Sequence, residues 1–512
     1  MGERVLLITI EAMDISLVRR GVAEGWLPAI AGLLEEGAGV RLAHAPDLMP
    51  GSAWTTVYTG RPVQDHLLMF HRQLAPGTTR IEDVDGDRTR VPVFWQFVSE
   101  AGLRSTVASA HGAPWIQPFN GTQVYWGTGE PYGVKQGPRS DPPEVLQWLD
   151  EACSSRRFGF LDRLPRTASE YRGYLEATCR EIRAQGEGLA LLMERTDWDF
   201  FYGNIYETHE AGHLLWHLRD GSGGDRLREP MRRVYQEADA ALGRLLERRD
   251  GNVRTFLMTS TGMTSHHPTF HATRSLLLQG GWMALGDGAA ADDDDRWLRL
   301  ASRIRPALHR LTPLALRQVL SRLAPGARER LLTAGPLLGV DWSATSAFPL
   351  PNDTHSAIRF NVTGREPHGV VDPGDGYARL AGDLAAAVDE LVDAASGRPA
   401  AREVYRMDRH LGMEVGDVLP DLVVEWEPRA IAALDSSRTG QITVPADPRT
   451  GDHRPEGFLI GAGQGVAHRP GALEGARAFH LLDLAPTMLA ALGLPVPPEL
   501  SGRPISAVLP SA

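Results

Sequence analysis

The sequence predicts an α/β fold in which a central, mostly parallel sheet is flanked by helices on both faces. Residues 5–10 and 253–259 form largely apolar runs that predict buried strands. Such runs are typical of strands that are covered on both faces of a parallel sheet. Residues 92–101 and 230–248 instead have the spacing of amphipathic helices. Strands that alternate with helices along a chain are typical of parallel α/β sheets.

The remaining elements follow from the same patterns, taken in chain order. Aromatic and β-branched runs predict further strands, and periodic apolar residues predict helices. Residues 143–195 are largely helical in pattern. The expected strands are residues 104–109, 200–202, 358–361, 422–425 and 458–460, and the expected later helices are residues 376–395 and 481–492.

The predicted domain organisation is one large core that is interrupted twice. Residues 1–275 form its first part, with a helical and loop insertion at about 112–195, and residues 340–512 form its second part. Between them lie residues 276–339, in which leucines alternate with arginines from Arg296 to Leu332. A basic amphipathic stretch can lie on a membrane surface or bind a partner, but we interpret this one as a helical cap insertion over the site.

Composition excludes several classes of protein. The 512 residues are 42% apolar and 23% charged, as in globular proteins. The net charge of −11 argues against nucleic acid or an anionic membrane as the main partner, so we expect a small-molecule substrate.

No apolar run reaches the ~18 residues of a membrane span, and two cysteines are too few for a disulfide framework. A strand follows Met1 almost directly, so we expect a cytoplasmic protein. Nothing predicts an oligomeric state.

The strand at residues 200–202 leads into two histidines, His209 and His213, which are four residues apart. On a helix they lie on one face, an arrangement that suits a transition metal. With Glu210 they also form the H-E-x-x-H signature of zinc proteases. However, Trp216 and Arg219 occupy the positions where an astacin-like continuation needs a glycine and a third histidine, which disfavours a protease.

Six collinear segments resemble the alkaline phosphatase superfamily, in particular its type I phosphodiesterase/nucleotide pyrophosphatase branch. They are residues 3–14, 52–60, 361–367, 419–424, 452–457 and 483–489. The resemblance implies an alkaline-phosphatase-like fold. It also implies a site built for two metals and a hydroxyl nucleophile at the start of a helix.

The first metal set that the resemblance implies is an Asp, a His four residues later and a late His. Here these positions are His209, His213 and His453. Three neutral imidazoles with an open position are typical of catalytic zinc. The predicted cofactor is therefore one divalent transition metal, zinc first, with iron, manganese or copper as alternatives.

The second implied set is degenerate. Its positions hold Glu11, Pro50, Ser260 and Thr261, so the nucleophile position lacks a hydroxyl and the usual Asp-His pair is gone. Ser52 is the nearest replacement nucleophile, and the alternative is a hydroxyl that caps the helix start. We expect Ser260 and Thr261 to line the substrate space instead.

Other polar residues near these motifs have two interpretations each. Glu11, relieved of metal binding, is a candidate general acid or base, or else a structural hydrogen-bond acceptor. His71 is a candidate substrate-binding residue, or a surface histidine. A short histidine cluster either rebuilds the second metal site or is a solvated loop; it comprises His266, His267 and His271.

The sequence thus predicts a mononuclear metal-dependent enzyme on a phosphodiesterase-like scaffold. Hydrolysis of an ester, amide or phosphoester by metal-bound water is the leading reaction, in place of standard two-metal phosphodiester hydrolysis. The alternatives are a metal-assisted lyase, isomerase or cyclase, a catalytically inactive binding protein, and a phosphodiesterase whose nucleophile is Ser52.

Overall fold

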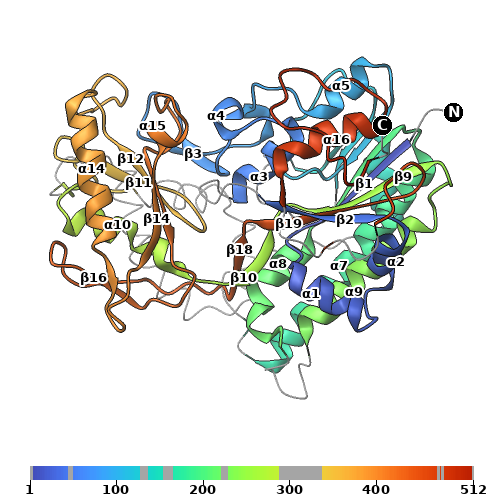
Figure 1. Cartoon of the computed structure of the whole chain (residues 1–512), viewed down its shortest axis with the longest axis horizontal. Helices are drawn as coiled ribbons and strands as arrows, with labels where there is room; N and C mark the ends of the chain where they lie inside the picture. Colours follow the sequence, from blue (N-terminus) through green and yellow to red (C-terminus); the bar gives the residue numbers. More distant parts are fainter. Residues whose placement is uncertain are drawn as a thin grey trace. The chain divides into compact units, whose positions relative to one another are not determined.

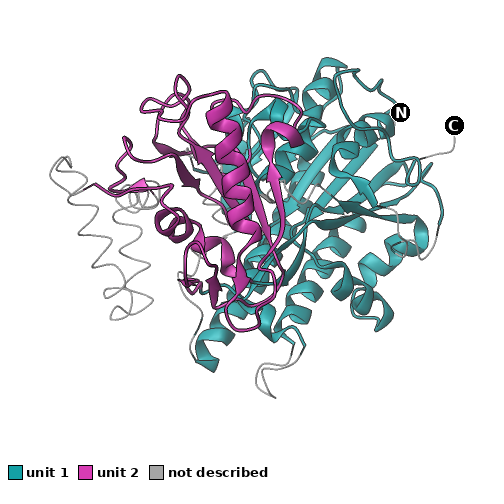
Figure 2. Ribbon diagram, turned by 60° about the vertical axis from the view of Figure 1, so that its left-hand side comes forward, with its two compact units in different colours: residues 1–68, 85–266, 448–512 teal, residues 69–84, 267–447 magenta. Residues whose placement is uncertain are grey.

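A computed structural model describes residues 4–43, 50–126, 137–153, 165, 167–220, 229–286, 337–469, 473 and 478–509. The chain divides into two compact units (Figure 2). Unit 1 comprises residues 1–68, 85–266 and 448–512, and unit 2 comprises residues 69–84 and 267–447. Residues 287–336, most of the predicted cap, lie outside the described residues. The predicted segmentation into core and cap therefore stays a prediction.

Unit 1 is built on one large sheet, which has nine strands in the described part of the chain. Parallel pairs join its central strands, whereas β19 is antiparallel to both of its neighbours and β7 is an antiparallel edge strand. The order is β20 (Ala478–His480), β2 (Ala38–Ala43), β19 (Glu456–Ala462), β9 (Val253–Thr259), β1 (Arg4–Ile10), β8 (Phe200–Ile205), β5 (Ser105–Ala108), β6 (Gly121–Tyr125) and β7 (Arg139–Asp141).

Helices cover both faces of this sheet (Figure 1). Val5 and Leu7 of β1 belong to a core with α3 (Pro50–Thr59), α5 (Phe94–Glu100) and α16 (Leu484–Ala491). Leu189 lies against the opposite face, beside Ile8. The helices on that face are α1 (Ile15–Ala23), α2 (Pro28–Glu36), α7 (Ala168–Arg195), α8 (Glu207–Leu215) and α9 (Pro230–Leu246). The predicted α/β fold with a mostly parallel, doubly covered sheet is confirmed.

Local side-chain contacts define where several of these helices begin. Asp14 accepts hydrogen bonds from the backbone of Ser16 and Leu17 at the start of α1. Pro28, which has no N–H to leave unpaired, occupies the first turn of α2. The next two N–H groups of α2 donate to Asp239 of α9, at 3.0 and 2.9 Å. Contacts of this kind satisfy the unpaired donors of a helix N-terminus.

Unit 2 contains a separate antiparallel sheet with α14 (Asp375–Asp389) and α10 (Thr273–Gln279) in its core. The strand order is β11 (Ala347–Leu350), β12 (Ser356–Phe360), β15 (Leu422–Trp426) and β14 (Ala401–Arg406). A buried ion-pair network joins two of the six resembling segments: Arg359 pairs with Glu366 at 2.7 Å, and Arg365 pairs with Asp421 at 2.7 Å. Burying these charges is tolerable because each is paired.

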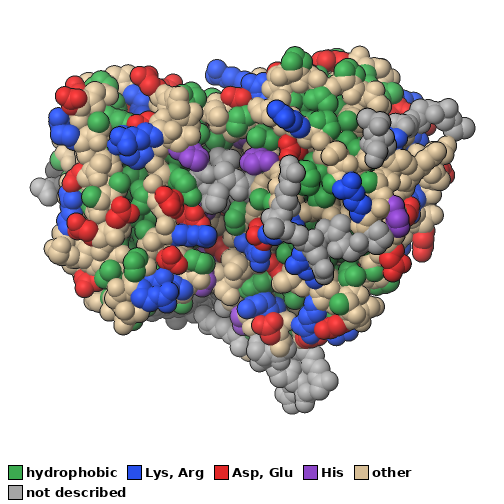
Figure 3. Space-filling view, in the orientation of Figure 1, with side chains coloured by type: hydrophobic (Ala, Val, Ile, Leu, Met, Phe, Trp, Pro, Cys, Tyr) green, Lys and Arg blue, Asp and Glu red, His purple; other side chains and the backbone are tan. Residues whose placement is uncertain are grey.

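Most predicted elements have the expected type. The strand at 253–259 matches β9, and the helix at 230–248 matches α9. The helix predicted at 376–395 was too long, because α14 ends at Asp389 and Val392–Asp393 instead pairs with Ala433–Asp435 as strand β13. Within the described segments, no helix is both long and apolar enough to cross a membrane. On the face drawn in Figure 3, acidic and basic side chains are interspersed.

Candidate metal centre

The predicted pair of histidines lies on α8, a helix that is separated from the end of β8 by one residue. Because α8 begins at Glu207, His209 and His213 fall on one face of the helix, and their ring centroids are 4.7 Å apart. His213 is buried, and the His209 side chain keeps 13% of its exposure. The site therefore starts where a parallel strand ends, the usual place for ligands in such sheets.

A two-stranded ribbon brings His453 to this face. Strand β10 (Gly262–Ser265) follows β9 almost directly and pairs with β18 (Gly451–Arg454), with Met263 opposite His453. Gly451 makes the approach to α8 possible, since a Cβ there would lie 2.2 Å from the carbonyl oxygen of Gly212. Thr450 also donates its N–H to the carbonyl of His213 at 2.7 Å.

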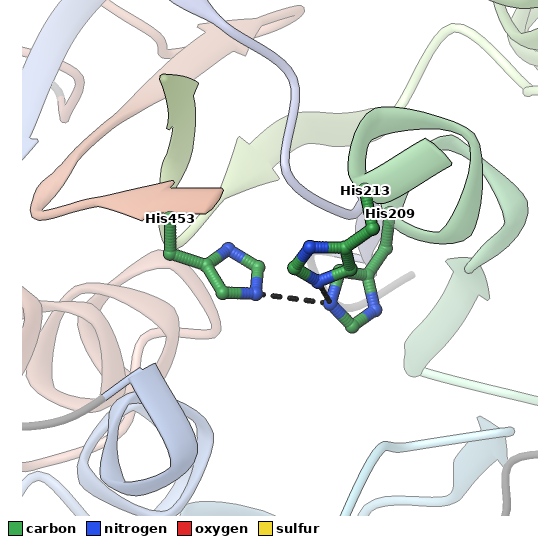
Figure 4. A group of neighbouring side chains, drawn as sticks. All are labelled: His209, His213 and His453. Carbon is green, nitrogen blue, oxygen red and sulfur yellow. Dashed lines mark hydrogen bonds between the residues drawn. The ribbon is translucent and has the colours of Figure 1, made fainter. Parts of the chain in front are cut away.

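The three imidazoles converge through their Nε2 atoms (Figure 4). His209 Nε2 lies 2.9 Å from both His453 Nε2 and His213 Nε2, and the possible ligand atoms of the three residues all lie within 4.8 Å of one another. Zinc bonds of about 2.0–2.1 Å at tetrahedral angles place imidazole nitrogens about 3.3 Å apart. The residues therefore fit a divalent metal, for which the two Nε2 separations of 2.9 Å would lengthen by about 0.4 Å.

The hydrogen bonds of the other ring nitrogens favour tautomers that present Nε2 lone pairs. Nδ1–H of His213 donates to the carbonyl oxygen of Gly451 at 2.8 Å, which leaves Nε2 unprotonated. His453 Nδ1 lies 3.3 Å from the hydroxyl of Thr261. Partners of this kind orient metal-binding histidines and fix their tautomers.

The surroundings keep His209 and His213 neutral. Burial lowers the pKa of His213 to about 3, with smaller contributions from His453 and Arg449. Burial also lowers the pKa of His209, assisted by His213 and His453. Neutral imidazole is the form that binds a metal, so His209 and His213 are in the metal-binding form at neutral pH.

Glu11 lies beside this group at the end of β1, and it is 3% exposed. Its Oε1 accepts a hydrogen bond from Asn204 Nδ2 at 2.6 Å. The same oxygen is 3.8 Å from His111 Nδ1, and Oε2 is 3.9 Å from His209 Nδ1. Glu11 therefore faces the side of His209 that does not converge on the other histidines. Whether it acts as general acid or base stays a prediction.

The other predicted site residues have varied surroundings. Ser52, on α3, is fully buried, and the hydroxyl of Thr261 lies near His453. Ser260 is also buried, at the end of β9. His71 belongs to unit 2, where its ring lies 4.0 Å from that of Phe70. The predicted roles of these residues in catalysis or substrate binding stay predictions.

Two histidines of the short cluster, His266 and His271, pair with aspartates. His266 Nδ1 lies 2.9 Å from Asp452 Oδ2, and His271 Nε2 lies 2.9 Å from Asp447 Oδ2. In the described part of the chain, the only group of three or more side chains placed to share a metal is the converging histidines. Asp452 also accepts from the backbone N–H of His453 at 2.8 Å, so the His266–Asp452 pair supports the ribbon that carries His453.

Three further residues near the converging histidines were given no individual role by sequence reasoning. Asn204 lies next to Thr9 in the pairing of β8 with β1. An asparagine at the end of an apolar strand could have indicated a residue near the site. His111 follows β5, and its ring stacks on Tyr206 at 5.8 Å. Arg449 precedes the ribbon, and its positive charge contributes to lowering the pKa of His209, of His213 and of Asp452.

Comparison with protein families matches residues 5–450 to the model of type I phosphodiesterase / nucleotide pyrophosphatase. The match spans both units and most of the chain. The chain belongs to the type I phosphodiesterase/nucleotide pyrophosphatase family. The predicted resemblance is thereby confirmed. Among curated proteins, no relative matches this phosphodiesterase-family chain.

Solved structures agree on the fold. The chain is similar to phosphonoacetate hydrolase from Sinorhizobium meliloti 1021 in complex with phosphonoacetate, with a TM-score of 0.52, 12% identity and 96% of each chain covered. It is also similar to a mutant of the alkaline phosphatase PafA, with a TM-score of 0.51, 12% identity and 99% of each chain covered. At this identity the likeness establishes the alkaline-phosphatase-like fold. Family membership supports, at the level of the family, a metal-dependent hydrolase of phosphoesters.

Proposed function

We propose that this family member is a hydrolase that uses one divalent transition metal, zinc first, held by His209, His213 and His453. The observation that carries the proposal is the convergence of three Nε2 atoms, with two of the distances at 2.9 Å. Three histidine ligands leave one position of a tetrahedral metal open for substrate or water, as in catalytic zinc sites.

The bound metal would supply a Lewis acid and lower the pKa of a coordinated water toward neutrality. The protein contributes the orientation of the ligands. Gly451 and Thr261 contact the outer nitrogens of His213 and His453. Burial lowers the pKa of His209 and of His213, so these two rings stay neutral.

A single metal is favoured by the residues that occupy the family's second metal set. Thr261 contacts His453 rather than offering a carboxylate or imidazole, and Glu11 Oε1 is hydrogen-bonded to Asn204. Paired metals normally stabilise both the attacking and the leaving oxygen of phosphoryl transfer. A one-metal enzyme must stabilise the second oxygen in another way.

The substrate class that we favour is a phosphoester, because that is the chemistry of the family. A phosphoester is anionic and needs local positive charge, which the overall charge of −11 does not supply. Arg449 is close enough to lower the pKa of His209 and of His213, after the larger effect of burial. We assign Arg449 to the binding of the substrate's anionic group.

The experiment that tests the proposal is metal content, measured by mass spectrometry on the purified full chain. We expect about one equivalent of metal in the wild type and its loss in His209→Ala and His453→Ala. His468→Ala is the matched control, because His468 is exposed. Hydrolysis of an aryl phosphodiester is then measured on the same samples and should follow metal content. Two equivalents, or none, would overturn the one-metal proposal.

A further inference from the structure

A chain of buried polar side chains runs between the central strands of unit 1 and ends at Glu11. The hydroxyl oxygens of Tyr58 and Tyr202 are 3.0 Å apart, and that of Tyr202 is 3.0 Å from Thr9 Oγ1. Thr9 Oγ1 is in turn 2.9 Å from Asn204 Oδ1. Each of these residues is at most 3% exposed. A polar series of this length in a core is costly unless every member is satisfied.

Every hydrogen bond in this series of side chains is donated in the direction of Glu11. Asn204 Nδ2 can only donate, and it donates to Glu11 Oε1 and to the carbonyl of Ser109. Its Oδ1 therefore accepts from Thr9, whose single proton is then used. Tyr202 must donate to Thr9, and Tyr58 to Tyr202. Burial raises the pKa of both tyrosines well above its usual value, so both remain donors.

The far end of the chain faces the metal-binding histidines. With Oε1 occupied by Asn204, Glu11 presents Oε2 toward His209 Nδ1, 3.9 Å away. His213 and His453 have neutral partners at Nδ1, Gly451 and Thr261. His209 Nδ1 is buried and has no hydrogen-bond partner among the described residues. The acidic group that faces it is the carboxylate of Glu11.

We infer that Glu11 is an outer-sphere positioning residue of the metal centre, fixed by the donor chain from Tyr58 through Tyr202, Thr9 and Asn204. At 3.9 Å the carboxylate is too distant for a hydrogen bond, and it acts on His209 through its charge. A negative charge behind an imidazole raises the basicity of its metal-binding nitrogen and favours a divalent cation there. This inference rests on the proposed metal centre and gives Glu11 a positioning role rather than one as general acid or base.

The test measures zinc affinity by chelator competition and the visible absorption spectrum of the cobalt(II)-substituted full chain. For Glu11→Gln, which keeps the shape and removes the charge, we expect zinc affinity to fall by about 10–100-fold, as for other outer-shell partners, with an altered cobalt spectrum. Thr9→Val breaks the donor chain without touching Glu11, and it should lower zinc affinity less but in the same direction.

Glu207→Gln is the matched control, because Glu207 is also a buried carboxylate and lies on the helix that carries His209. It should leave zinc affinity and the cobalt spectrum unchanged. Equal zinc affinity in wild type and Glu11→Gln would overturn the inference, as would an equal loss in Glu207→Gln. Loss of aryl phosphodiester hydrolysis in Glu11→Gln at unchanged zinc affinity would restore the catalytic role. Failure of the wild type to bind zinc would instead refute the proposed metal centre itself.

Discussion

His66 is a fully buried histidine outside the proposed site. It ends the short helix α4 (Val63–His66), and its two ring nitrogens are both used: Leu68 N–H donates to Nδ1 at 3.1 Å, and Nε2–H donates to the hydroxyl of Thr56 at 3.0 Å. Burial lowers the pKa of His66 to about 3. The native state therefore holds this imidazole neutral, whereas the unfolded state protonates it near pH ~6.5.

The lowered pKa of His66 makes the protein less stable as the pH falls. Between pH ~6.5 and about 3 the unfolded state binds one more proton at this residue, so the free energy of unfolding falls as the pH falls, by up to about 1.4 kcal/mol per pH unit. We expect His66→Asn, which keeps an acceptor for Leu68, to reduce that slope by about one proton. Denaturant unfolding from pH 7 to 5 measures it, with His468→Asn as control. An unchanged slope in His66→Asn would contradict this account.

At the scale of elements, the proposed metal site depends on how closely the β10–β18 ribbon approaches α8. Gly451 faces a backbone oxygen that cannot move away, because it belongs to helix α8. We expect Gly451→Ala to force the ribbon outward, to destabilise the protein by about 1–3 kcal/mol and to weaken zinc binding at least tenfold, since His453 moves with the ribbon. Calorimetry and zinc titration check both effects.

The control for that substitution is a glycine with free space around it. A Cβ at Gly173, inside α7, would meet nothing within 4 Å. Gly173→Ala should therefore stabilise the protein by about 0.5–1 kcal/mol, the helix preference for alanine, and leave zinc binding unchanged. If both alanine variants bind zinc as the wild type does, close approach of the ribbon is not what places His453.

The elements explain how far the sequence could predict this site. His209 and His213 were predictable because helical spacing puts them on one face, and His453 followed from the resemblance of its segment to a known family. The contact between Glu11 and Asn204 could not be predicted from the sequence, because it depends on the β1–β8 register that pairs Thr9 with Asn204. A one-residue shift in register would turn the asparagine to the other face of the sheet.

Strand pairing also decides two other features that the sequence did not predict: the contact that supports the β10–β18 ribbon and the end of helix α14. His266 reaches Asp452 only because β10 and β18 pair with Thr264 opposite Asp452. Apolar runs were sufficient to predict β1 and β9, since both are buried on both faces. They could not predict where α14 ends. The end is set by Val392 and Asp393, which pair with strand β16 about forty residues further along the chain.

At the scale of the whole molecule, the three histidines of the proposed metal site all belong to unit 1. In sequence, nearly all of unit 2, residues 267–447, lies between His213 and His453. A metal that binds the native state but not the unfolded state stabilises it by about 2.7 kcal/mol at a hundredfold excess over Kd. Because its ligands come from α8 and β18, that stabilisation should be concentrated in the elements that hold them.

We therefore expect zinc to slow amide hydrogen exchange in unit 1, most of all in α8, in the β10–β18 ribbon and in the adjoining strand β9, and to leave β11, β12, β14 and β15 of unit 2 unchanged. Hydrogen exchange measured by mass spectrometry with and without zinc tests this. His453→Ala should remove the effect because it deletes the ligand that joins the ribbon to α8. Equal protection of the unit 2 sheet would mean that the units unfold together, and the metal would then stabilise the molecule as one cooperative body.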